Sequence, residues 1–183
     1  MPLTVATLYA PGLKSQARPL QSVLETLFPG LRSGGLFEAA LPRAAYDTAR
    51  GWYDAPFLLA RAMPATPSCA LALWLINAPL GDSRHPWLLG AAVSGKAVVS
   101  AARLTSPQAL AKVAAHEIGH LLGLAHCRSR CLMRVAPDED RLTPLPLSLC
   151  AACQKRLASH ACLDQHYVEK ADAPARGENP RGK

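Results

Sequence analysis

The feature that most constrains this chain is the segment from His116 to His126, which reads HEIGHLLGLAH. His116 and His120 are four residues apart, so on a helix both imidazoles lie on one face and can reach the same ion. Gly123 lets the helix end in a conformation that other residues resist, and the chain can then bring His126 to that ion. Three such ligands leave one tetrahedral position open for water, which is typical of catalytic zinc sites.

Glu117 follows the first of these histidines. A carboxylate at that place can reach a zinc-bound water without being a ligand itself, so Glu117 is the candidate general base. The shorter pattern HExxH also occurs by chance, and its structural alternative is a group of histidines without metal. The added glycine and third histidine make the extended pattern specific.

Four of the six cysteines form two close pairs. Their number and spacing suit a closed tetrahedral zinc site with the ligands Cys127, Cys131, Cys150 and Cys153. Disulfides are the first alternative, which a reducing compartment disfavours. A redox role for the CxxC pair is the second, and this pair lacks the usual βαβ setting. Three downstream residues could each replace one of the four ligands: His160, Cys162 and His166.

Length and composition indicate one domain. A chain of 183 residues, half of them hydrophobic, can bury a core without cross-links. Isoleucine occurs only at Ile76 and Ile118, while alanine and leucine dominate, which favours helices over strands. The longest apolar run, Cys69–Ile76, is far shorter than the ~20 residues that span a membrane. The first residues also lack the pattern of a secretory signal, so we predict a cytoplasmic protein without membrane association.

The formal net charge is +7. This charge permits nucleic-acid binding, but the basic residues are scattered singly with few aromatics among them. An ordinary charged surface is the better interpretation, and nucleic acid is a disfavoured partner.

Residue patterning predicts an α/β N-terminal half. We expect strands at Leu3–Tyr9 and Cys69–Ile76, and a hairpin of Leu88–Val93 and Lys96–Ser100 around Ser94-Gly95. We expect helices over Ser15–Phe28, from Pro42 onward, from Thr105 or Ser106 to Gly123, and over Leu147–Leu163. Loops are expected at 30–35, around Pro64 and Pro67, and over Asn77–Pro86. Either Thr105 or Ser106 can cap the helix that carries the histidines.

The segment from His116 to His126 resembles the metzincin zinc-binding consensus. The cysteine that directly follows it, then Cys131-Leu132-Met133 and Cys150-x-x-Cys153, resemble the archaemetzincins in particular. Two upstream stretches are also similar to that family: Gly90–Ala92, and Val98–Ser100 with Arg103-Leu104. The resemblance covers roughly residues 40–163. Two spacings, Cys127 to Cys131 and Met133 to Cys150, are one residue shorter than we expect for the family.

The resemblance implies an α+β fold: a compact zincin with a twisted sheet, an active-site helix and a small zinc-stabilised C-terminal lobe. We expect a single domain over 1–169, with lobes at about 1–123 and 124–169, and a disordered tail over 170–183. It also implies residue roles. His116, His120 and His126 are expected to bind a catalytic zinc, Glu117 to act as base, and Met133 to lie beneath the histidines. The four paired cysteines are expected to hold a second, structural zinc.

The function implied is a zinc-dependent metalloprotease that hydrolyses peptide bonds of a peptide or protein substrate. The edge strand Leu89–Val93 is the candidate for pairing with the substrate backbone. A monomer is favoured. The alternative is a catalytically silent, zinc-stabilised module that binds peptides or proteins. Glu117 argues against it, because a scaffold does not need that carboxylate.

Overall fold

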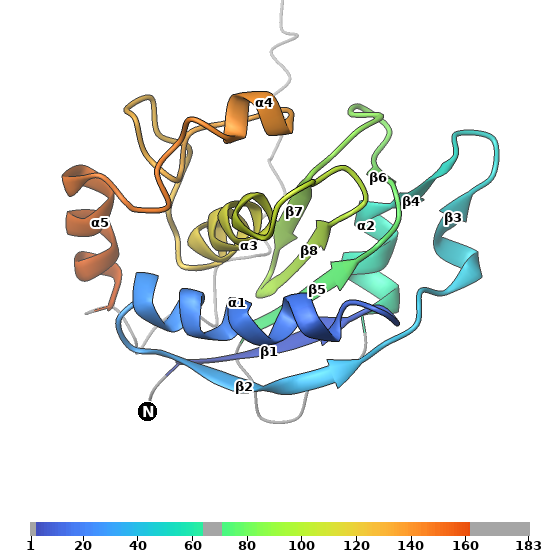
Figure 1. Cartoon of the computed structure of the whole chain (residues 1–183), viewed down its shortest axis with the longest axis horizontal. Coiled ribbons are helices and arrows are strands. Elements are labelled where there is room, and N and C mark those ends of the chain that lie inside the picture. Colours follow the sequence, from blue (N-terminus) through green and yellow to red (C-terminus); the bar gives the residue numbers. More distant parts are fainter. Residues whose placement is uncertain (1–2, 64–70, 162–183) are drawn as a thin grey trace, which may run out of the picture.

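The computed structural model describes residues 3–63 and 71–161. Five strands form the main sheet in the order β2-β1-β5-β8-β7. They are β1 (Leu3–Tyr9), β2 (Leu31–Glu38), β5 (Leu71–Ile76), β7 (Gly90–Val93) and β8 (Lys96–Ser100). The first four strands in that order are parallel, and β7 runs antiparallel to β8 at the edge. Helices α1 (Lys14–Leu27) and α3 (Pro107–Leu121) lie side by side over one face of the sheet (Figure 1).

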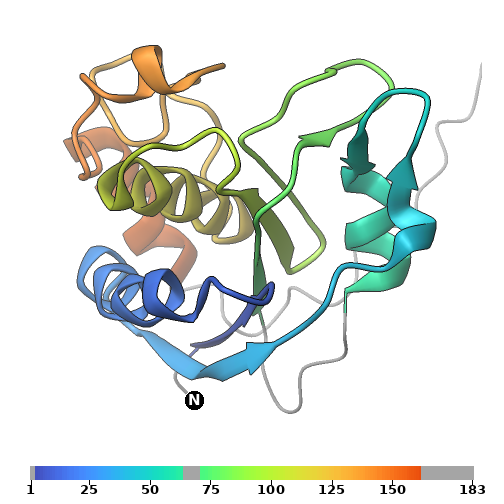
Figure 2. The same ribbon diagram turned by 45° about the vertical axis from the view of Figure 1, so that its right-hand side comes forward.

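A second, small sheet has the order β3-β4-β6, with β3 (Tyr46–Asp47), β4 (Trp52–Asp54) and β6 (Leu80–Gly81). It continues into α2 (Ala55–Phe57) and the π-helical turn Leu58–Ala62. Figure 2 shows this unit on the far side of the main sheet from α1 and α3. The C-terminal part holds two further helices, α4 (Glu139–Leu142) and α5 (Ala151–Ala161).

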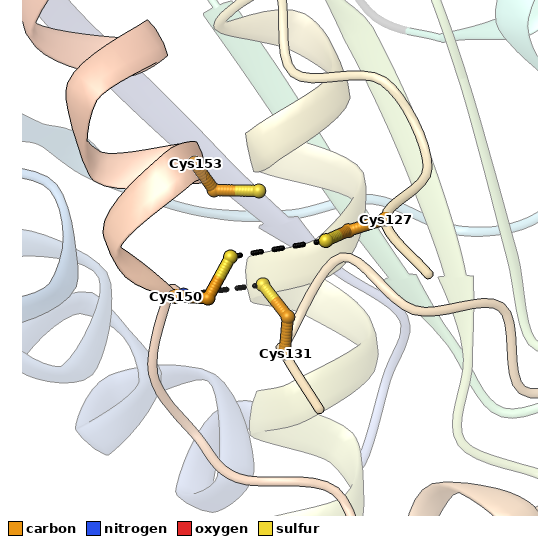
Figure 3. A group of neighbouring side chains, drawn as sticks. All are labelled: Cys127, Cys131, Cys150 and Cys153. Carbon is orange, nitrogen blue, oxygen red and sulfur yellow. Dashed lines mark hydrogen bonds between the residues drawn. The ribbon is translucent and has the colours of Figure 1, made fainter. Parts of the chain in front are cut away.

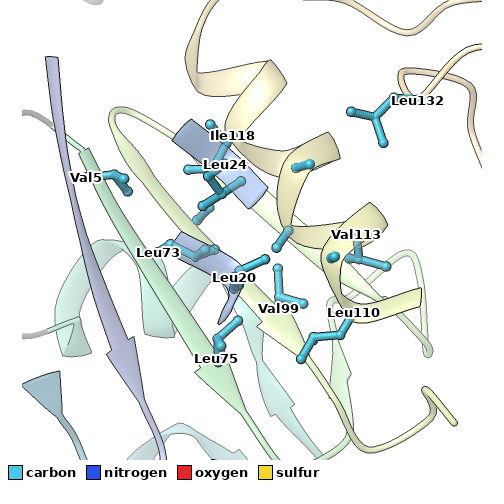
Figure 4. Packing of buried hydrophobic residues seen from close by; sticks show 14 of the residues in the cluster. Val5, Leu20, Leu24, Leu73, Leu75, Val99, Leu110, Val113, Ile118 and Leu132 are labelled. Atoms are coloured by element: carbon cyan, nitrogen blue, oxygen red, sulfur yellow. The ribbon is translucent and has the colours of Figure 1, made fainter. Parts of the chain in front are cut away.

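Strand β5 is buried on both faces, as its unbroken apolar run predicts. Because side chains alternate along a strand, Leu73 and Leu75 pack beneath α1 and α3, while Trp74 and Ile76 pack toward the π-helical turn. Figure 4 shows the first of these layers, in which Ile118 and Val113 of α3 lie over the sheet. This layer fixes the helix that carries two of the three histidines.

Several predicted elements are confirmed. The strand Leu3–Tyr9, helix α1 and the β7–β8 hairpin lie where the pattern placed them. Ser94 and Gly95 have φ of 48° and 77°, as the two-residue hairpin turn with positive φ requires. Ser106 caps α3, because its Oγ accepts a hydrogen bond from the Ala109 N–H at 3.0 Å.

Other predictions are wrong. Residues 30–35, expected as a loop, begin strand β2, whose pairing with β1 shifts by one residue between Val5 and Thr7. The glycines of this segment lie at that bulge. Pairing with the parallel strand β1, rather than the β-propensity of these residues, therefore makes the segment a strand. The helix expected from Pro42 is only the 3₁₀ turn Arg43–Ala45, and strands β3 and β4 follow. Asp47 turns the chain there, because its Oδ1 accepts hydrogen bonds from the N–H groups of Ala49 and Arg50.

Smaller differences concern element bounds. The loop expected over Asn77–Pro86 contains β6, and the last helix begins at Ala151 rather than Leu147. The loop around Pro64 and Pro67, and the tail over 170–183, lie outside the described residues. Within the part of the chain that the structure describes, every helix is too short or too polar to cross a membrane.

Candidate metal centres

The three histidines converge beside the C-terminal end of α3. One ring nitrogen from each lies within 4.8 Å of the others, and the Nε2 atoms of His116 and His120 are 3.0 Å apart. Two nitrogens bound at about 2.0–2.1 Å to one tetrahedral ion stand ~3.3 Å apart. The donor set and its spacing therefore fit a single zinc ion with only a small adjustment.

Two backbone carbonyls orient these imidazoles. Nδ1 of His116 lies 2.9 Å from the Leu132 oxygen, and Nδ1 of His120 lies 2.8 Å from the Leu124 oxygen. A carbonyl can only accept, so Nδ1 carries the proton and Nε2 presents its lone pair to the shared point. Burial lowers the pKa of His116 to about 4 and also lowers that of His120. Both rings are thus neutral near pH 7, which is the form that binds metal.

The third histidine reaches the cluster through a turn at Gly123. This residue has φ of +84°, in the left-handed region that favours glycine, and it follows the last turn of α3. The Leu124 N–H then donates to the Gly119 oxygen at 2.9 Å, which closes the helix end. His126 itself is exposed, so one side of the cluster faces solvent.

Glu117 lies against the edge strand β7. Only 7% of its surface is exposed, and burial raises its pKa to about 8. A Cβ on Gly90 would stand 2.8 Å from both Cγ and Oε1 of Glu117, closer than real Cβ contacts allow. The carboxyl group therefore occupies the space that any larger residue at position 90 would fill. A cation held by the adjacent histidines would favour its ionised form and lower this pKa again.

The four cysteines meet between the loop after α3 and the start of α5 (Figure 3). Their sulfur atoms all lie within 4.8 Å of one another, and the Cys127 and Cys150 sulfurs are 3.8 Å apart. A disulfide needs about 2.05 Å, so these two thiols are not bonded. Four sulfurs placed ~2.3 Å from one tetrahedral zinc stand about 3.8 Å from each other. The cluster therefore fits zinc without rearrangement of this pair.

Backbone N–H groups favour thiolates in this cluster. A hydrogen bond from the Cys153 N–H lowers the pKa of Cys150 to about 7, and the Cys150 N–H donates to the Cys131 sulfur at 3.3 Å. Burial instead raises the pKa of the Cys153 thiol. A cation at the centre would favour the thiolate form of all four cysteines, because a coordinating thiol is deprotonated outright.

The two clusters share the segment from Cys127 to Met133. The oxygen of Leu132 orients His116, while its N–H donates to the Ser148 oxygen at 3.0 Å, two residues before Cys150. The Cys127 N–H donates to the Met133 oxygen at 2.8 Å. The backbone that holds the cysteines thus also positions a histidine.

Met133 is completely buried and packs against α3 at Gly119. A Cβ on Gly119 would stand 2.5 Å from its sulfur, so the glycine within the HEIGH motif admits the methionine. The sequence pattern does not identify three further positions that shape the site: Leu124, Leu132 and Gly90. The first two act through backbone carbonyls, which leave no side-chain signal, and the third acts by having no side chain.

The structure thus gathers the seven predicted ligands into two groups. Of the three alternative ligands, Cys162 and His166 lie outside the described residues. For His160 only the backbone, within α5, is described.

Three kinds of comparison place the chain among known proteins. The sequence model of Peptidase family M54 matches residues 108–159. The archaemetzincin of Nanoarchaeum equitans is 28% identical over 124 residues, which cover 67% of this chain and 72% of that protein. The archaemetzincin of Halobacterium salinarum is 31% identical over 136 residues, covering 64% and 78%. The crystal structure of archaemetzincin from Methanopyrus kandleri matches with a TM-score of 0.78 and 25% identity, over 87% of this chain and 96% of that one.

Proposed function

Because this chain belongs to the archaemetzincins, zinc metallopeptidases of family M54, we propose that Glu117 and the three histidines hydrolyse peptide bonds at a zinc ion. We propose further that the four cysteines hold a second, structural zinc. One observation carries the catalytic assignment. The Glu117 carboxyl group lies one residue from His116 and directly against the backbone of the edge strand β7.

The ligand set assigned to the catalytic ion is Nε2 of His116 and His120 together with one ring nitrogen of His126. When bound there, zinc would act as a Lewis acid that polarises the scissile carbonyl and lowers the pKa of a bound water to about 7. The Leu132 and Leu124 carbonyls keep the first two imidazoles in the required tautomer.

Glu117 moves the proton. Its carboxylate accepts a proton from the attacking water as the water oxygen bonds to the scissile carbon, and then gives it to the leaving nitrogen as the C–N bond breaks. The substrate strand pairs with β7, the terminal strand of the described main sheet. Since Gly90 of β7 touches Glu117, this pairing presents the scissile bond next to the base.

The cysteine centre is proposed as structural because four thiol ligands fill a tetrahedron and leave no position for substrate. It ties the loop after α3 to the start of α5, in the segment that we propose as a small lobe over about 124–169. Binding free energy at such a site stabilises the fold directly.

The decisive comparison is wild type against Glu117→Gln, which preserves the size of the side chain but removes the base. We expect kcat to fall by about 10²–10⁴-fold, with zinc content and melting temperature unchanged. Glu38→Gln, an exposed carboxylate at the end of β2, is the matched control and keeps full activity.

Two outcomes would overturn the proposal. One is normal cleavage by the Glu117→Gln protein. The other is a zinc-loaded wild type that cleaves no member of a broad peptide library, which would favour a zinc-stabilised binding module.

A further inference from the structure

We propose that Arg103, stacked on Trp87 just before the edge strand β7, binds a carboxylate of the peptide substrate. The enzyme would then prefer peptides that carry a carboxylate two or three residues beyond the scissile bond on its C-terminal side. This inference rests on the proposed function and names the substrate class for the same active site.

Arg103 and Trp87 form one end of a ladder of rings and guanidinium groups. The guanidinium carbon of Arg103 lies 3.7 Å from the Trp87 ring centroid, and Trp87 is 45% exposed. The edge of Trp52 packs against Trp87 with centroids 5.7 Å apart. Trp52 packs closely against Gly81, because a Cβ on that glycine would stand only 2.7 Å from the indole nitrogen. The Trp87 ring beneath Arg103 is thus backed by the buried Trp52.

Stacking prepares this arginine for a carboxylate. A guanidinium that lies over an aromatic face keeps its N–H groups at its edge, where they match the two oxygens of a carboxylate. The aromatic contact also restricts the side chain beforehand, so less rotamer freedom is lost when the ligand binds.

The charge of Arg103 is unneutralised within residues 3–63 and 71–161. There the ion pairs join Arg50 to Asp47 at 3.5 Å and His85 to Asp82 at 3.2 Å, and neither involves Arg103. Arg50 offers an internal comparison, since it lies 5.9 Å over Trp52 in the same ladder but is already paired. An exposed, oriented and unpaired cation is complementary to an anionic substrate group.

The short separation of Trp87 and Gly90 in the sequence places the Arg103–Trp87 stack close to Glu117. The Leu88 N–H donates to the Leu80 oxygen, and the Leu89 oxygen accepts from the Ser100 N–H, so the chain is held between Trp87 and Gly90. Three residues span at most ~10 Å, and Gly90 touches Glu117. The stack is thus within about three substrate residues of the scissile bond.

The direction of the substrate follows from strand pairing. The antiparallel ladder is the more stable one, and a peptide that pairs with β7 in this direction extends from the scissile bond toward Leu88 with its C-terminal residues. Leu80 already pairs with Leu88 at that edge, so the peptide leaves the strand there and passes beside Leu80 toward Trp87. The carboxylate can be an Asp or Glu side chain there, or the C-terminal carboxylate of a peptide that ends there.

The test uses four peptides of one sequence that differ three residues after the scissile bond. The first has Glu there and continues, the second has Gln and continues, and the third ends there as a free acid, with its amide as control. For wild type we expect kcat/KM to be about tenfold higher with either carboxylate than with its neutral partner, mainly through KM. The two pairs distinguish a side-chain carboxylate from a C-terminal one.

Arg103→Gln should bring each pair to equal kcat/KM. Arg50→Gln removes the same charge from the same ladder and should keep the preference, which separates a contact from the general field of the protein. Trp87→Ala is the second variant and should reduce the preference.

Equal kcat/KM for wild type within both pairs would overturn the inference, and that comparison needs no variant to fold. An equal loss in the Arg50 and Arg103 variants would also overturn it. If no peptide is cleaved, the proposed function fails instead. Equilibrium binding of the same peptides to the zinc-loaded protein then decides the subsite, with equal affinities overturning it.

Discussion

The histidine and cysteine clusters are joined by the segment Cys127–Met133, yet they are built in opposite ways. The histidine cluster has two ligands one turn apart on α3 and a third on an exposed turn. The cysteine cluster draws its ligands from a loop and from the start of α5, with Cys131 and Cys153 fully buried. The first cluster is partly open to solvent, and the second is largely enclosed by protein.

This difference in construction indicates that the geometry of the histidine cluster depends on the cysteine cluster. Helix α3, which carries His116 and His120, packs in a main core that also includes Leu132 and Cys153 of the C-terminal part. Leu132, whose carbonyl orients His116, donates its N–H to the oxygen of Ser148, two residues before Cys150. The closed cluster is therefore expected to support the open one, while the open cluster contributes little to the fold.

The largest effect should come from breaking the closed cluster. Cys150→Ser removes a ligand, so we expect loss of that zinc, a melting temperature lower by on the order of 10 °C, and loss of cleavage. Ser148→Ala is the control, because it keeps the backbone oxygen that Leu132 uses. Full zinc content with normal melting in Cys150→Ser would show that the clusters are independent.

A chelator should separate the clusters in wild type. A dilute chelator is expected to remove the histidine-bound ion first, because His126 is exposed and one coordination position is open. Cleavage should then be lost while the melting temperature changes little, and added zinc should restore activity. Loss of the cysteine-bound ion before any loss of activity would reverse the comparison.

A smaller effect should come from the histidine region alone. Gly90→Ala places a Cβ against the Glu117 carboxyl group, so the base must move. We expect kcat to fall by ~10²-fold, with zinc content unchanged and a destabilisation of about 1–3 kcal/mol.

The matched control is Gly35→Ala, whose added Cβ would contact the Phe37 ring. Both residues lie on β2, at the opposite edge of the main sheet from β7. It should lower stability but keep kcat. An active Gly90→Ala enzyme would show that Glu117 does not need this position.

Local sequence signals predicted the parts of the site that local structure builds. The histidine spacing, a cap at Thr105 or Ser106 and the helix end at Gly123 depend on a few neighbouring residues, so the sequence predicts each of them. Strand β2 was missed because its glycine-rich start becomes a strand only through pairing with β1. The carbonyl partners of the histidines were missed for a related reason, since any residue offers the same oxygen and only the fold chooses which one is used.

The most direct test of this account is the number of zinc ions per folded chain, measured by native mass spectrometry. We predict two for wild type, one for His120→Ala with the melting temperature nearly unchanged, and fewer than two for Cys153→Ser with a clear loss of stability. A wild-type chain that binds a single zinc, or a His120→Ala chain that still binds two, would contradict the division into an open catalytic centre and a closed structural one.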